Sequence, residues 1–360
     1  MTAEEIRDLL KQIAYPGFSR DIVSFGLVKE IHIERDRLEV RLSMATENQD
    51  VISAVVANVE GLLGARDGLP PVDVIVEKPQ GSKPEQAREM AQQMGGGPRG
   101  IPGIARVVAV ASGKGGVGKS TVAANLSVAL ARAGWRVGLL DADIYGPSIP
   151  TMFAVEGRDG DATDAEGRFL PAEREGVKLV SMGMFVADGA PLIWRGPMLT
   201  KALGQFLGDV AWGDLDYLIL DLPPGTGDVQ MTLTQNVALD GGVIVTTPQD
   251  VALADVERGV KMFEQASTPV LGVIENMSVH ECSECGHRSH PFGDGGGLRV
   301  ANRFAVSFLG ALPLLRAVRE AGDAGRPLAA ADPDGAVGKA FAELARRLTT
   351  EVPVAGVGHA

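Results

Sequence analysis

A glycine-rich stretch between residues 113 and 121 constrains the fold of this chain more than any other feature. It reads Gly113, Lys114, Gly115, Gly116, Val117, Gly118, Lys119, Ser120 and Thr121, which fits the P-loop pattern G-x-x-x-x-G-K-[ST]. Glycines let backbone N–H groups close on an anion, the last lysine reaches the β- and γ-phosphates, and the next hydroxyl ligates Mg²⁺. Residues 107–111 predict a buried strand before the loop, and residues 120–132 predict a helix whose N-terminus adds a positive dipole end. Lys114 is a second cation that the bare pattern does not require.

The composition narrows the class of protein. The chain has 360 residues, a net charge of -12 and a hydrophobic content of 45%, and this length predicts about two domains. The acidic balance argues against nucleic acid as a partner. The first residues are acidic and have no apolar segment of a signal peptide, and no apolar run approaches the roughly 18 residues of a membrane span. We therefore expect a cytoplasmic protein that binds neither a membrane nor a nucleic acid.

The hydrophobic pattern divides the chain into four parts. Residues 1–78 predict a small α+β domain, residues 79–103 a flexible Gly/Pro-rich linker, and residues 351–360 a C-terminal tail. Strands and helices alternate over residues 104–350, which is typical of an α/β fold with a doubly wound, mainly parallel sheet. Its predicted strands are Arg106–Ala111, Val137–Leu140, Lys178–Met182, Tyr217–Leu220, Gly242–Thr246, Val270–Ile274 and Phe308–Leu312. Residues 340–352 predict a final helix packed on this sheet, and the P-loop falls at the carboxyl end of a strand, where ligands bind in such folds.

Carboxylates follow two of the predicted strands. Asp221 ends an apolar strand, as the Walker B carboxylate does, and we expect it to hold Mg²⁺ through water. Asp141 and Asp143 follow a neighbouring strand near the same edge; we assign Asp143 to positioning the attacking water or stabilising Mg²⁺, and Asp141 to supporting it, with a turn aspartate as the alternative. Gly225, in the loop after Asp221, can bring a backbone N–H close to a γ-phosphate and so report the state of the nucleotide.

The expected nucleotide is ATP. The sequence has no Asn-Lys-x-Asp motif for reading guanine, and Asn276, just beyond a predicted strand, is a candidate adenine contact, with a turn asparagine as the alternative. Lys114 is not needed to bind the nucleotide of its own subunit. Because a cation near the γ-phosphate neutralises charge in the transition state, we assign Lys114 to catalysis together with Lys119. A solvated surface lysine is the alternative for Lys114.

The only cysteines of the chain, Cys282 and Cys285, form a C-x-x-C pair. Such a turn points both sulfurs the same way and suits a metal clamp or a redox pair. Glycine and proline follow the pair in place of a helix, which disfavours a thioredoxin-like redox role. His287 and His290 would complete a Cys₂His₂ zinc site within one chain. Alternatively, a second subunit would supply two more cysteines and complete the Cys₄ set of an iron–sulfur cluster; the spacing does not choose between these sites.

Taken together, the motifs resemble the Mrp/ApbC-type iron–sulfur cluster carriers, P-loop ATPases of the deviant Walker A group that includes MinD and ParA. The resemblance rests on residues 113–121, 141–148, 194–198, 221–228 and 247–250, and on residues 275–278 before the C-x-x-C pair. Residues 1–78 are similar, through residues 20–28, to a small domain often fused to these carriers. That domain often carries a cysteine near the position of residues 45–48, and this chain has none there. We therefore expect a docking or structural role for residues 1–78.

The resemblance implies a homodimer with two facing ATP sites, in which Lys114 of each subunit reaches the phosphates of the other. It implies that Cys282 and Cys285 of both subunits bridge one [4Fe–4S] cluster, which is transferred to apo iron–sulfur proteins. The nucleotide and Mg²⁺ roles fall to Lys119, Ser120, Asp143 and Asp221. We expect slow ATP hydrolysis. Two other hypotheses are a positioning ATPase like MinD or ParA and a P-loop ATPase with a structural zinc at the C-x-x-C pair.

Overall fold

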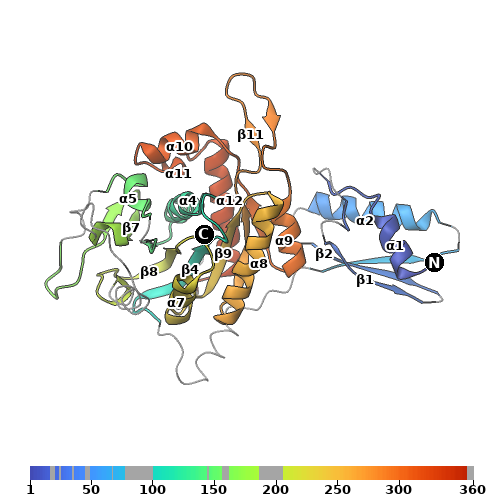
Figure 1. Ribbon diagram of the computed structural model, residues 1–360, viewed down its shortest axis with the longest axis horizontal. Coiled ribbons are helices and arrows are strands. Elements are labelled where there is room, and N and C mark those ends of the chain that lie inside the picture. Colours follow the sequence, from blue (N-terminus) through green and yellow to red (C-terminus); the bar gives the residue numbers. More distant parts are fainter. Residues whose placement is uncertain are drawn as a thin grey trace.

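The computed structural model describes residues 1–16, 21–23, 26–34, 36–44, 49–66, 68–77, 100–143, 146–155, 162–185 and 206–354. Most of the predicted linker, residues 194–198 of the resemblance, residues 45–48 and the end of the predicted tail lie outside the described residues. The described chain forms a small unit with a three-stranded sheet and a larger unit with an eight-stranded sheet (Figure 1). None of the described helices has both the length and the apolar character needed to cross a membrane.

The small unit begins with a capping box. The Thr2 hydroxyl accepts the Glu5 N–H at 3.2 Å, and the Glu5 carboxylate accepts the Thr2 N–H at 2.7 Å, which satisfies two free donors at the start of the first helix. The elements are α1 (Ala3–Leu10), β1 (Val28–Ile33), β2 (Leu38–Ser43), α2 (Gln49–Gly64) and β3 (Val72–Glu77), with strand order β1-β2-β3. Strand β1 was not predicted, because Val28 is its only buried residue and the sequence therefore lacks a clear alternation.

The larger sheet has the order β13-β10-β9-β4-β8-β5-β7-β6, and every neighbouring pair is parallel except β6 with β7. Its strands are β4 (Ile104–Ala111), β5 (Val137–Asp141), β6 (Ala172–Arg174), β7 (Val177–Ser181), β8 (Leu215–Asp221), β9 (Gly241–Thr246), β10 (Val270–Glu275) and β13 (Phe308–Ala311). This confirms the predicted doubly wound, mainly parallel sheet. The seven predicted strands are all present, with ends that differ by no more than two residues.

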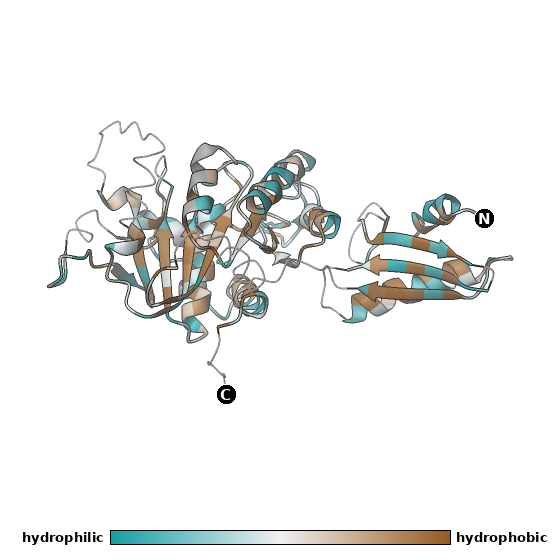
Figure 2. Ribbon diagram, turned by 90° about the horizontal axis from the view of Figure 1, so that it is seen from below, coloured by the Kyte–Doolittle hydropathy of each residue, from teal (hydrophilic) through white to brown (hydrophobic). Residues whose placement is uncertain are grey.

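Helices cover both faces of this sheet, so its central strands are buried and mostly apolar (Figure 2). Along β4, Val107 packs into one apolar cluster and Val108 into the other. The first cluster takes side chains from α8 (Asp250–Gln265) and α9 (Gly296–Phe304), and the second from α4 (Lys119–Arg132) and α12 (Ala336–Glu351). Helix α12 buries Phe341 and Leu344, which confirms the prediction of a final helix packed on the sheet.

The remaining elements are short or lie at the edges. They are α5 (Ile149–Met152), the 3₁₀ turn η2 (Met182–Phe185), α7 (Asp228–Asn236), α10 (Arg316–Asp323), α11 (Leu328–Ala331) and the two-stranded ribbon of β11 (His280–Glu281) and β12 (Arg288–Ser289). The ribbon projects from the body of the larger unit between β10 and α9 (Figure 1). It carries the two cysteines at its tip.

Candidate nucleotide and cluster site

The glycine-rich loop joins β4 to α4, as predicted. Gly116 and Gly118 have φ angles of 80° and 83°, a left-handed conformation that is costly for residues with a Cβ. Gly113 is required for a different reason: a Cβ there would lie 2.3 Å from the Cβ of Asp255 in α8. The loop is therefore closely packed between α8 on one side and the start of α4 on the other.

Lys119 and Asp221 form a buried ion pair beneath this loop. The Lys119 ammonium lies 2.6 Å from Oδ1 of Asp221 and 3.2 Å from the Ser120 hydroxyl. Burial raises the pKa of Asp221, and the charge of Lys119 opposes that shift. The other carboxylate oxygen, Oδ2, is buried and has no hydrogen-bond partner among the described residues. Since a buried acceptor normally has a partner, Asp221 and the Ser120 hydroxyl offer oxygen ligands of the kind that Mg²⁺ prefers.

The two carboxylates after β5 have different environments. Asp141 is fully buried: its Oδ1 accepts the Asp143 N–H at 3.0 Å, and its Oδ2 accepts the Ser181 hydroxyl at 3.0 Å and the Ile149 N–H at 3.3 Å. Burial first, and then the charge of Asp221, raise the pKa of Asp141 to about 7. Asp143 is 8% exposed and lies close enough to Asp221 for their charges to interact. Asp141 thus holds the backbone that carries Asp143.

Two other predicted residues have partners within the chain. The Lys114 ammonium donates to Oε1 of Gln249 at 2.9 Å, so Lys114 is not simply solvated. Gly225 has a φ angle of 95°, and its N–H donates to the carbonyl of Ser112 at 3.0 Å. A contact between the Gly225 N–H and a γ-phosphate therefore requires this loop to exchange one acceptor for the other.

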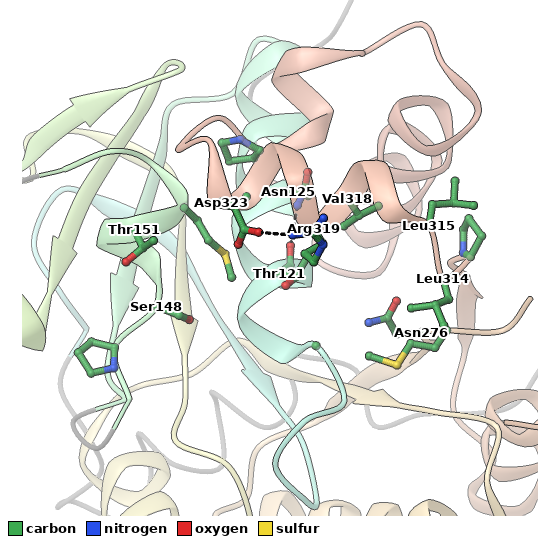
Figure 3. Close-up of a pocket in the computed structure, with 17 residues that line it drawn as sticks. Thr121, Asn125, Ser148, Thr151, Asn276, Leu314, Leu315, Val318, Arg319 and Asp323 are labelled. Atoms are coloured by element: carbon green, nitrogen blue, oxygen red, sulfur yellow. Dashed lines mark hydrogen bonds and ion pairs between the residues drawn. The ribbon is translucent and has the colours of Figure 1, made fainter. Parts of the chain in front are cut away.

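A cleft of about 410 Å³ opens beside the P-loop and α4 (Figure 3). It is lined by Gly118, Thr121, Asn125, Pro147, Ser148, Thr151, Met152, Asn276, Met277, Pro313, Leu314, Leu315, Val318, Arg319, Gly322, Asp323 and Pro327. One wall belongs to α10, where the Arg319 guanidinium pairs with the Asp323 carboxylate at 2.8 Å. Because its lining is mostly apolar with a few polar groups, the cleft suits a flat heterocyclic ligand next to the phosphate loop.

Asn276 joins this cleft to the P-loop. Its side-chain amide nitrogen donates to the Val117 carbonyl at 2.9 Å, and its backbone N–H donates to Thr246 at 2.7 Å. A Cβ on Gly118 would lie 2.3 Å from that amide nitrogen, so the contact also depends on glycine. The next residue, Met277, has a φ of 59°, a conformation that non-glycine residues rarely adopt and that clusters at functional sites. Asn276 therefore contacts the P-loop and also lines the cleft.

The C-x-x-C pair occupies the tip of the ribbon. The Cys282 N–H donates to His287 at 2.9 Å, and the Cys282 carbonyl accepts the Gly286 N–H at 2.8 Å, which closes a tight turn. Cys285 is exposed and Cys282 is half-buried, and neither forms a disulfide. Hydrogen bonds from the backbone N–H groups of Glu284 and Cys285, and then from the Cys285 thiol, lower the pKa of Cys282. The thiolate is the form that binds metal, so this turn favours a ligand role.

The histidines do not complete a zinc site here. Among the described residues, no group of three or more His, Cys, Asp or Glu side chains is placed to hold one metal ion. His290 instead lies at the base of the ribbon, where its Nδ1 is 2.8 Å from the Ser278 carbonyl oxygen. To hold a four-coordinate metal, Cys282 and Cys285 would therefore need ligands beyond the described residues of their own chain.

The base of the ribbon is bound to a wall of the cleft. The Ser278 N–H and hydroxyl both donate to the Leu312 carbonyl at 2.9 Å. The Leu314 N–H donates to the Val279 carbonyl at 2.8 Å. Leu314 and Leu315 line the cleft. The segment of residues 312–315 thus lines the cleft and also forms hydrogen bonds with residues 278–279 at the base of the cysteine ribbon.

Comparison with known proteins identifies the family. The sequence model of the NUBPL iron-transfer P-loop NTPases matches residues 103–349, and that of an iron–sulfur cluster assembly protein matches residues 3–76. The chain belongs to the NUBPL iron-transfer P-loop NTPase family. It is 42% identical over 365 residues to the iron-sulfur cluster carrier protein of Aquifex aeolicus, covering 98% of this chain and 99% of that protein. It is 55% identical over 249 residues to the carrier protein of Pseudomonas fragi, covering 68% of this chain and 86% of that protein.

Solved structures agree with this membership in the NUBPL family. A nucleotide-binding protein from Archaeoglobus fulgidus, solved in complex with ADP, matches with a TM-score of 0.55 and 38% identity over 68% of this chain and 92% of that one. The cell division ATPase MinD of Pyrococcus furiosus matches with a TM-score of 0.52 and 21% identity over 68% of this chain and 99% of that one. The MinD likeness shows the fold alone.

The sequence motifs assigned no role to several residues of this NUBPL-family site. They are Gln249, Ser181, Met277 and the cleft wall formed by residues 313–319. Most of them follow a strand of the parallel sheet at its carboxyl end. That rule predicts a site role for residues 247–250, which already belong to the family resemblance, and for residues 312–315. No local pattern distinguishes Ser181, because its role depends on β7 lying beside β5.

Proposed function

We propose that this chain is an ATP-binding and ATP-hydrolysing iron–sulfur cluster carrier. Two chains would hold one [4Fe–4S] cluster as cargo through Cys282 and Cys285 of each and would transfer it to apo iron–sulfur proteins. Family membership and the names of the relatives support the carrier role. The exposed half-site at the ribbon tip supports a cluster shared with a second chain, because four thiolates make the usual ligand set.

The P-loop and the adjacent cleft would bind ATP with Mg²⁺. The loop N–H groups and Lys119 face the phosphates, while Asp221 and Ser120 hold the metal, which neutralises phosphate charge. Since the amide nitrogen of Asn276 already donates to Val117, its oxygen is the group available to the base. That oxygen can accept a hydrogen bond from the amino group of adenine, whereas guanine presents an acceptor there. The Archaeoglobus relative bound to ADP supports an adenine nucleotide.

Hydrolysis would depend on position and charge more than on covalent chemistry by the protein. Asp143, held by the buried Asp141, would orient the water that attacks the γ-phosphorus. Lys119 in its own chain, and Lys114 from the partner, would stabilise negative charge on the γ-phosphoryl group as it passes from ADP to water. Because Lys119 is paired with Asp221 in the nucleotide-free chain, binding of ATP must redistribute this ion pair, and we expect turnover to be slow.

The observation that carries the proposal is the shared segment between cleft and ribbon. Hydrogen bonds from Ser278 to Leu312 and from Leu314 to Val279 tie the cysteine ribbon to residues that line the nucleotide cleft. A change in how the nucleotide fills the cleft would therefore reach the ribbon through backbone hydrogen bonds, which supports coupling of ATP to cluster binding.

The test is anaerobic reconstitution with iron and sulfide of the wild type and of Cys282→Ala/Cys285→Ala, read by absorption spectra, iron content and mass in solution. We expect a broad band near about 400 nm and roughly four irons per dimer in the wild type, and neither in the double variant. Lys119→Ala should lose ATP binding or turnover and still accept a cluster. A colourless wild-type monomer with one zinc per chain would overturn the proposal.

A further inference from the structure

In the free chain, Lys114 is held by a neutral amide of its own chain. Its ammonium donates to Oε1 of Gln249 at 2.9 Å, and no ion pair joins Lys114 to a carboxylate within the described residues. A hydrogen bond between a charged and a neutral group is weaker than one between two groups of opposite charge. Such a contact orders the lysine and still yields readily to a phosphate, which offers both charge and several acceptor oxygens.

Gln249 is well placed for this role. It precedes α8, yet its side chain forms no cap hydrogen bond with that helix. The side chain is therefore committed to Lys114 and not to the start of α8. It follows that shortening Gln249 should leave the helix terminus unchanged, which makes the residue suitable for substitution.

The residues on either side of Gln249 contact α9, the helix that follows the cysteine ribbon. Pro248 packs directly against Gly296, where an added Cβ would lie 2.4 Å from the Pro248 carbonyl oxygen. On the other side of Gln249, the Asp250 carboxylate pairs with the guanidinium of Arg299 at 3.1 Å. Gly296 and Arg299 both belong to α9, the helix that follows the ribbon. Residues 248–250 therefore link the Lys114 contact to the element that carries the ribbon's C-terminal end.

We propose that Gln249 is a positioning residue that holds Lys114 in its own chain until a partner's nucleotide takes the lysine away. This inference rests on the proposed role of Lys114 in the dimer. Release of Lys114 frees the Gln249 amide, and residues 248–250 then transmit dimer formation to α9 and the cysteine ribbon. The contact thus keeps Lys114 ordered in the monomer. ATP-driven dimer formation must then break the hydrogen bond between Lys114 and Gln249.

The test compares Gln249→Glu and Gln249→Ala in the full chain. A glutamate replaces the neutral acceptor with an ion pair and should weaken dimer formation with a non-hydrolysable ATP analogue about fivefold, since exposed ion pairs contribute up to about 1 kcal/mol. Alanine removes the acceptor and should strengthen dimer formation several-fold. Analytical ultracentrifugation measures both. In a Lys114→Ala background both effects should vanish, because coupled residues give non-additive changes.

Equal effects of the Gln249 variants with and without Lys114 would overturn the proposal, as would dimer constants that match the wild type. A second readout does not depend on dimers: a zero-length carbodiimide should join Lys114 to residue 249 in nucleotide-free Gln249→Glu, and mass spectrometry of the peptides detects the link. Absence of that link overturns the contact itself. A wild type that binds no ATP analogue would instead overturn the proposed function, while the cross-link still reports on the contact.

Discussion

Among single residues, Asp141 has the clearest electrostatic consequence. Burial raises its pKa to about 7 from 3.8, so the folded chain binds a proton that the unfolded chain has released between these values. Stability from this group is present at low pH and is lost as the pH rises through about 7. We expect the unfolding free energy of the nucleotide-free wild type to fall by about 3 kcal/mol between pH 5 and pH 8, relative to Asp141→Asn. Urea unfolding of both proteins at these pH values is the measurement, and parallel pH profiles would contradict the assignment.

Asn276 is the residue that we propose to select the base of the nucleotide. Asn276→Ala removes the acceptor proposed for the adenine amino group and also the bond to Val117. We expect the preference for ATP over GTP to fall about tenfold, which corresponds to one hydrogen bond of about 1.4 kcal/mol. Competition binding with fluorescent nucleotides measures this ratio. Thr151→Ala, a change elsewhere in the cleft lining, is the control and should keep the preference.

At the scale of elements, the start of α9 lies so close to the backbone of Pro248 that only a glycine fits at position 296. A Cβ on Gly296 would meet backbone atoms of Pro248, which cannot move aside as a flexible side chain can. We expect Gly296→Ala to lower the unfolding free energy by about 1–3 kcal/mol, as overpacking does. Gly208→Ala, where the space is open, is the matched control. Denaturant titration measures both, and equal stability of the two variants would show that α9 can shift without cost.

The elements also show what sequence patterns can and cannot predict. Strands such as β4 and β8 were predictable, because buried apolar runs next to a glycine-rich loop permit few other structures. The roles proposed for Lys119, Ser120 and Asp221 were inferred from their positions at strand and helix ends. The partner of Lys114 was not predictable, since Gln249 lies 135 residues away and meets the P-loop only when α8 packs beside it. The short strands β11 and β12 escaped prediction because a two-residue strand has no period to detect.

At the scale of the whole molecule, the small unit contacts the larger one at the C-terminal end of α9. The Lys29 ammonium donates to the Asn302 carbonyl in the last turns of that helix, and burial lowers the pKa of Lys29. Cations are favoured at this end of a helix, because the last carbonyls carry partial negative charge. Ile31 of the small unit and Phe304 of α9 are both partly buried against one apolar cluster that includes residues of both units. The helix that follows the cysteine ribbon therefore also receives the small unit.

Reversing this charge should separate the two units. A carboxylate in Lys29→Glu would face the carbonyl end of α9 and be repelled, so we expect a larger radius of gyration in small-angle X-ray scattering of the nucleotide-free chain. Lys11→Glu is the control, because Lys11 lies on the same small unit and pairs only with its own Asp8 at 2.7 Å among the described ion pairs. Unfolding of either variant is checked by circular dichroism. If Lys29→Glu and Lys11→Glu give the same radius of gyration, the docking of the small unit does not depend on Lys29. The contact between Lys29 and α9 would then not hold the two units together.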